Sequence, residues 1–92
     1  MVVLSSTYIL NPVVAIEDFR ERALALHCTN LRLVELNATA RDLLARLDGQ
    51  ASLAQIAAAM AHDYRQPEVL VQEDLCTIVA AMAKLDLVVP VN

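Results

Sequence analysis

Histidine, cysteine and acidic residues are the side chains of this chain that could carry chemistry. His27 and Cys28 are neighbours, whereas His62 and Cys76 stand far from them and from each other. Zinc sites usually draw ligand pairs from short spacings such as C-x-x-C or H-x-x-x-H, and neither spacing occurs here. The sequence therefore predicts no metal site, and nothing in it points to another cofactor.

A catalytic centre is equally hard to assemble from these residues. Covalent catalysis needs a nucleophile beside a base, but adjacent residues of a strand, such as His27 and Cys28, point to opposite faces. The acidic pairs Glu17-Asp18 and Glu73-Asp74 are also sequence neighbours, which do not face each other on a strand or a helix. With one glycine in the chain, a glycine-rich phosphate loop is excluded. We therefore predict that the protein is not an enzyme.

Both cysteines are expected to be structural. Cys28 is in phase with Leu24 and Leu26, and free cysteine behaves as a small buried hydrophobe. Two cysteines at this separation do not form a disulfide framework, and no secretory signal pattern opens the chain. These features favour a reduced, cytoplasmic compartment.

The first part of the chain alternates with a period of two residues, which predicts strands. Residues 1–12 are interpreted as an N-terminal arm ending in a turn at Asn11-Pro12. Glu21-Arg22 and Thr29-Asn30 are expected to form two further turns. Strands joined this tightly form an antiparallel meander. Its three strands are expected at residues 13–18, 23–28 and 31–36.

From residue 37 the period changes to 3.6, which predicts three helices. Asn37 is a suitable N-cap for the first, and Asp48-Gly49 is expected to end it. Ser52 and Gln55 form a capping box for the second, and Pro67 suits the first turn of the third. The apolar stripes expected to face the core are Ala40, Leu43, Leu44 and Leu47; Leu53, Ile56, Ala57, Met60 and Tyr64; and Val71, Leu75, Ile78, Met82 and Leu85.

A β-branched segment at 87–91 predicts a short closing strand, which Pro90 would keep at a sheet edge. The order of elements predicts an α+β, winged-helix-like fold: a three-stranded antiparallel sheet, three helices and a short C-terminal strand in one domain over residues 1–92. Hydrophobic residues make up 58% of the chain and aromatic ones 3%, so the core must be aliphatic. No apolar stretch approaches the ~20 residues that span a bilayer.

A winged-helix order raises the possibility of a DNA-binding regulator. Nucleic-acid binding draws most of its affinity from a concentrated basic surface, whereas this chain has a net charge of -4 and seven scattered basic residues. The third expected helix carries Glu68, Glu73 and Asp74, with Lys84 as its single base. The charge therefore disfavours nucleic acid, and a regulator stays as an alternative.

The third expected strand is the best candidate for binding a partner. Leu36 leads into the first helix and should point inward, which leaves Leu33 partly exposed. An exposed apolar strand is a liability unless something covers it. Two explanations are open: self-pairing in a homodimer or structural subunit, or addition of a partner peptide as a fourth strand.

Several motifs resemble the PqqD family, the small domains also called RiPP recognition elements. They occur in order between Val13 and Val89. They are Leu36-Asn37-Ala38-Thr39-Ala40, Leu47-Asp48-Gly49, the capped helix starting at Ser52-Leu53 with Ile56 inside it, Leu75 in the long helix, and Leu87-Val88-Val89.

The resemblance implies a non-catalytic peptide chaperone in the biosynthesis of a ribosomally made, modified peptide. It implies that the leader of a precursor peptide adds beside the third strand, lies against the third helix, and is presented to a modifying enzyme, often a radical SAM protein. Carried over by position, the strand contacts are Leu31, Leu33, Val34 and Glu35. The helix contacts, chosen by helical phase, are Leu70, Asp74, Thr77 and Ile78.

Overall fold

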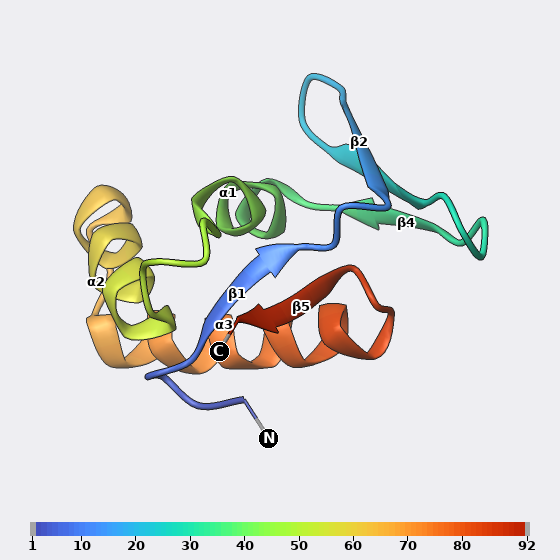
Figure 1. Ribbon diagram of the computed structural model, residues 1–92. Coiled ribbons are helices and arrows are strands. Elements are labelled where there is room, and N and C mark those ends of the chain that lie inside the picture. The colour runs from blue at the N-terminus through green and yellow to red at the C-terminus, as the bar shows by residue number, and fades with distance from the viewer. Residues whose placement is uncertain (1, 92) are drawn as a thin grey trace.

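The computed structural model describes residues 2–91, which form three helices and two small sheets (Figure 1). Strands β2, β3 and β4 form an antiparallel meander in that order, and β1 pairs antiparallel with β5. The expected α+β class, with a three-stranded sheet, three helices and a C-terminal strand, is confirmed. The elements are β1 (Thr7–Leu10), β2 (Val14–Asp18), β3 (Ala23–His27), β4 (Leu33–Leu36), α1 (Ala38–Arg46), α2 (Leu53–Tyr64), α3 (Glu68–Lys84) and β5 (Val88–Val91).

The N-terminal arm contains β1, a strand that the sequence did not predict. Its residues 7–10 pair with 91–88 of β5, so the closing strand joins the arm rather than the meander. Tyr8 is buried in the core. The first two amides of α2 donate to the carbonyl oxygens of Ser6 and Leu4, which gives partners to groups that a helix start leaves free. The arm is therefore packed into the fold.

The meander has one buried face and one open face. Ala23, Ala25 and His27 of β3 are 0%, 0% and 3% exposed, whereas Leu24 and Leu26 on the other face are half-buried. Small alanines at these positions let the sheet approach the core closely. The sequence analysis placed Cys28 in phase with Leu24 and Leu26 as a buried residue. That face is the open one, so the expectation of a buried Cys28 is wrong.

The third strand of the meander is shorter than expected, because the turn before it is longer. Residues 28–30 form the turn, and Leu31 adopts a left-handed backbone with φ 61°. Its amide donates to the carbonyl oxygen of His27 at 2.7 Å, which closes the turn. The strand therefore begins at Leu33, and Leu31 precedes it.

Side-chain caps fix the starts of α1 and α2 as expected. Asn37 Oδ1 accepts from the amide of Ala40 at 2.8 Å, and Ser52 and Gln55 form the reciprocal capping box. Gly49, however, does not close α1. The helix ends at Arg46, and its C-cap Leu47 is extended. Gly49 (φ 76°) turns the chain beyond it, and its amide donates to the carbonyl oxygen of Tyr8.

The apolar stripes largely match those expected, with differences at their margins. In α3 the buried residues are Val71, Leu75, Val79 and Met82, while Ile78 is half-buried. Tyr64, at the end of α2, is 46% exposed and its hydroxyl donates to Asp42. The apolar face of a surface helix is wider than one residue per turn. A stripe drawn with one residue per turn therefore misses buried neighbours such as Val79.

Replacing either cap should destabilise the domain measurably. We expect Asn37→Ala and Ser52→Ala each to lower the free energy of unfolding by about 1 kcal/mol, because each leaves helical amides without an acceptor. Urea denaturation followed by circular dichroism measures the change. Midpoints identical to that of the unsubstituted chain would contradict the two caps.

Candidate functional site

The outer edge of β4 carries backbone groups that face away from the sheet. Paired residues in an antiparallel ladder alternate between those that exchange hydrogen bonds and those that do not. The amide of His27 donates to the carbonyl oxygen of Arg32 at 2.9 Å, and Ala25 is registered with Val34. It follows that Val34 bonds toward β3. The amides and carbonyls of Leu33 and Glu35 therefore point outward, to the free edge.

Two of the side chains on this edge, Leu31 and Leu33, are apolar and exposed. Leu31 is 73% exposed and Leu33 is 60% exposed, while Val34 is half-buried over the core. Glu35 Oε1 accepts from Arg22 Nη1 at 3.4 Å, an exposed pair that contributes little to stability. The structure thus gathers the four expected strand residues at one edge, where an extended chain could form main-chain hydrogen bonds.

The four helix candidates are arranged differently. Leu70, Asp74 and Thr77 are exposed on α3, and Ile78 is half-buried. Leu70 lies in the first turn of α3. This first turn lies below α2, at the opposite end of the molecule from β4 (Figure 1). Within residues 2–91, no hydrogen bond or ion pair joins the helix set to the strand set. The structure therefore brings the strand residues together at one edge, and Val34 and Ile78 both pack against the shared core, but no polar contact links the two sets within residues 2–91.

Thr77 faces the N-terminal segment. It lines two adjoining hollows beside α3, of about 610 and 430 Å³. Val2 borders the first of them and Leu4 the second. Cys76 lines both as well. Helical phase on α3 could not predict that Thr77 faces the N-terminal segment, because the packing of that segment was itself not predicted.

A further hollow, of about 360 Å³, lies between the β2–β3 turn and α1, and the sequence analysis missed it. Phe19, the single phenylalanine of the chain, lines this hollow. Its side chain is 54% exposed, so it does not contribute to the core. Arg41 donates to both carboxylate oxygens of Asp18, at 2.7 and 3.1 Å, and this bidentate pair lowers the pKa of Asp18. An isolated aromatic residue in a polar turn was the available signal.

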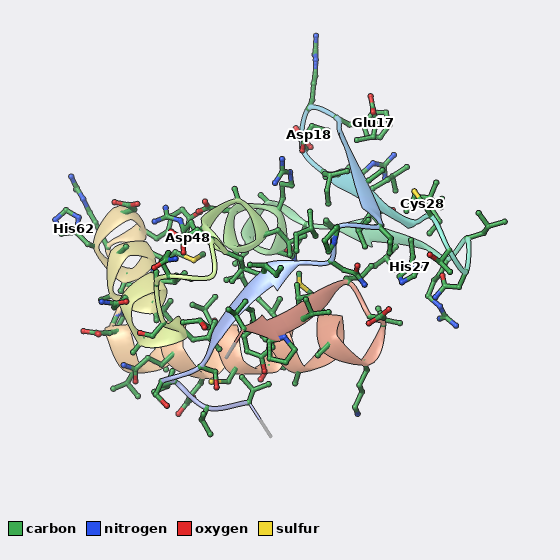
Figure 2. All side chains as sticks on the ribbon, in the orientation of Figure 1. Glu17, Asp18, His27, Cys28, Asp48 and His62 are labelled. Carbon is green, nitrogen blue, oxygen red and sulfur yellow. The ribbon has the colours of Figure 1, made fainter. Side chains whose placement is uncertain are left out.

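The side chains first considered for chemistry do not converge. Figure 2 shows Glu17 and Asp18 on the β2–β3 hairpin and His62 at the far end of the molecule on α2. His27 is buried and its Nε2 lies 2.9 Å from Asp86 Oδ2, while Cys28 is exposed. Within residues 2–91, no three His, Cys, Asp or Glu side chains lie close enough together to hold a metal ion.

The cysteines are expected to be dispensable. Because Cys28 is exposed and Cys76 half-buried, we expect Cys28→Ser to leave stability within about 0.5 kcal/mol and Cys76→Ala to lower it by about 1 kcal/mol at most. Thermal denaturation of both single variants measures this. Stoichiometric zinc in the purified protein, lost when both cysteines are replaced, would contradict the expectation that neither cysteine is a metal ligand.

No helix within residues 2–91 combines the length and the apolarity needed to cross a bilayer.

The fold and this edge define a class: a small, winged-helix-like α+β domain with an open edge strand. The family model described as "Coenzyme PQQ synthesis protein D (PqqD)" matches residues 20–88. The chain belongs to the PqqD family, as its motifs indicated.

A solved structure entitled "TbiB1 in Complex with the TbiA(beta) Leader Peptide" has a similar fold. Its TM-score is 0.77 at 19% sequence identity, over 87% of this chain and 93% of that chain. At this identity the likeness supports the fold. No curated protein sequence matches the chain.

Proposed function

We propose that this domain binds the leader of a ribosomally made precursor peptide, by adding the leader as a fourth strand at the edge of β4. The observation that carries the proposal is the outward-facing backbone of Leu33 and Glu35, flanked by exposed apolar side chains. Membership of the PqqD family supports it, as does the fold shared with a protein that was solved with a leader peptide. Strand addition would supply main-chain hydrogen bonds, and the exposed leucines would supply selectivity.

The helix residues Leu70, Asp74, Thr77 and Ile78 are proposed as a second contact. α3 has 17 residues, so it is about 25 Å long at 1.5 Å per residue. An extended peptide covers that length with roughly eight residues. A leader that contacts both β4 and the start of α3 must therefore continue well beyond the added strand.

The domain is proposed to present the bound precursor to a modifying enzyme, often a radical SAM protein, in the cytoplasm, and to perform no catalysis itself. Its partners are then peptide and protein, without nucleic acid, membrane or cofactor. The acidic character of α3 supports this choice over a DNA-binding regulator. A gel shift of duplex DNA that weakens with salt would favour the regulator.

A second candidate function is self-pairing of β4 in a homodimer or structural subunit. The exposed apolar edge itself favours it, because such an edge is a template for another strand. Light scattering at micromolar concentration, with and without a leader peptide, separates the two. A dimer that a leader peptide does not dissociate would favour self-pairing.

Leu33→Asp should weaken leader binding by about tenfold or more, because it places a charge where an apolar leader side chain would lie. The measurement is fluorescence anisotropy of a labelled synthetic leader peptide. Thr77→Arg should also weaken binding if α3 is contacted. His62→Ala, on α2 at the far end of the molecule (Figure 2), is the control and should bind within about twofold of the unsubstituted chain.

Amide NMR shifts recorded during the same titration locate the site. Strand addition requires the largest shifts at residues 31–36. Shifts clustered on α2 and the chain ends, with Leu33→Asp binding as tightly as the unsubstituted chain, would exclude addition at β4.

A further inference from the structure

Leu31 combines two features that rarely occur together. Its backbone has φ 61°, in the left-handed region that glycine or asparagine usually occupies. Its side chain is 73% exposed, so packing in the core does not explain why a leucine stands there. A strained, exposed apolar residue at the start of a free edge strand points to a role outside the domain itself.

The backbone of this turn is held from three directions. The carbonyl oxygen of His27 accepts from the amide of Leu31 at 2.7 Å. The ring atom Nδ1 of His27 accepts from the amides of Thr29 and Asn30, both at 3.3 Å. The side chain of Asn30 in turn accepts from the amide of Arg32 at 2.9 Å. These bonds hold the backbone amides of residues 29–32 in place between β3 and β4.

His27 also ties the turn to the rest of the domain. The ring is 3% exposed, and its Nε2 lies 2.9 Å from Asp86 Oδ2 in the loop between α3 and β5. Because Nδ1 accepts two amide protons, the ring proton resides on Nε2, which donates to the carboxylate. Asn11 Nδ2 donates to the same carboxylate at 3.2 Å and to the Asp86 carbonyl oxygen at 3.0 Å. The turn is thereby anchored to the segment that follows β1 and to the loop that precedes β5, at one end of the β1–β5 sheet.

We propose that the turn held by His27 presents Leu31 as a fixed apolar contact for the leader peptide, just beyond the strand that the leader forms along β4. This inference rests on the proposed function and adds a chemical requirement to it. The leader must carry one apolar residue that contacts Leu31, in addition to the apolar residue that contacts Leu33. Leu31 is a specificity-determining residue, and His27 is a positioning residue that acts through the turn.

Leu31→Gly separates the contact from the strain. Glycine tolerates the left-handed backbone, so we expect the thermal midpoint to stay level or rise, while leader affinity falls about tenfold through loss of the apolar side chain. The matched control is Arg65→Gly, since Arg65 has φ 53° at the end of α2, far from β4. It should raise or keep the midpoint in the same way and leave leader affinity unchanged.

His27 is tested by two substitutions that each keep one half of its bonding. His27→Asn places an oxygen near the position of Nδ1 and keeps an acceptor for the turn, whereas His27→Gln keeps a donor toward Asp86 and loses that acceptor. We expect leader affinity to fall more in the Gln variant than in the Asn variant. A ¹⁵N spectrum of the imidazole should show the proton on Nε2, without any peptide present.

The outcomes distinguish this inference from the proposed function. If the labelled leader peptide does not bind the unsubstituted chain, the proposed function fails and this inference with it. If the peptide binds, but Leu31→Gly binds as tightly as the unsubstituted chain, the inference alone is overturned. A lower thermal midpoint for Leu31→Gly, or an imidazole proton on Nδ1, would contradict the strained turn that the inference requires.

Discussion

Gly49→Val is expected to lower the free energy of unfolding by about 2–4 kcal/mol, the largest single effect on stability that we predict outside the core. Gly49 has φ 76°, a conformation that β-branched residues strongly disfavour. A Cβ atom at this position would also lie 3.0 Å from Cγ2 of Ile9 and 3.5 Å from Cγ2 of Val91. The substitution therefore strains the backbone and crowds the β1–β5 sheet. Urea denaturation measures the change.

Gly49→Asn is the matched comparison. Its Cβ atom meets the same contact with Ile9, but asparagine tolerates the left-handed backbone far better than valine does. We therefore expect a smaller loss for Asn than for Val. Equal losses would show that crowding against Ile9, and not the backbone, limits the position. A Val variant as stable as the unsubstituted chain would contradict the packing of the Gly49 turn against β1 and β5.

Local signals account for what the sequence predicted correctly. The cap at Asn37 and the box formed by Ser52 and Gln55 each depend on groups three residues apart. The meander likewise joins neighbouring strands through short turns, so alternation in residues 14–36 was enough to predict its order. Such features are decided within a few residues and leave a direct pattern in the chain.

Non-local pairing accounts for what the sequence missed. β1 is a strand because residues 88–91, about eighty positions away, supply its partner. No local pattern within residues 7–10 predicts that pairing. The pairing of β1 with β5 also explains why Gly49 lies in a turn against Tyr8 of β1 and does not end α1.

The wrong face for β3 has a different cause. Both faces of this strand carry apolar side chains, so alternation could not decide which one faces the core. A buried Cys28 was expected on the face of Leu24 and Leu26, but Ala23 and Ala25 on the other face are the residues that the sheet buries. Close packing favoured the small residues.

The candidate site was predictable in part for the same reasons. The strand residues were carried over by position from the family resemblance, and in the structure Leu31, Leu33, Val34 and Glu35 lie at one open edge. The helix residues were chosen by phase on α3, and phase says nothing about which side of a helix faces a strand elsewhere in the fold. The role of the strand residues and of the helix residues alike stays a prediction for experiment.

Glu35→Pro should reduce leader affinity by about 100-fold, the largest functional effect that we expect. The amide of Glu35 faces the free edge, so proline removes a donor that the leader strand needs and puts its ring in the leader's path. Proline is tolerated on an edge strand whose amide faces solvent, so the domain should stay folded. Anisotropy titration with the labelled leader peptide measures the loss, and circular dichroism checks the fold.

Two further substitutions isolate the backbone amide as the cause. Glu35→Ala removes the same side chain and its exposed pair with Arg22 but keeps the amide, so leader affinity should stay within a few-fold. Val34→Pro removes an amide that bonds to β3 and should destabilise the sheet by about 3 kcal/mol, which confirms the alternation of the ladder. If the Pro variant at position 35 is folded and binds the leader as tightly as the Ala variant, the leader does not hydrogen-bond along this edge, and the affinity must come from side chains elsewhere, with α3 the next surface to test.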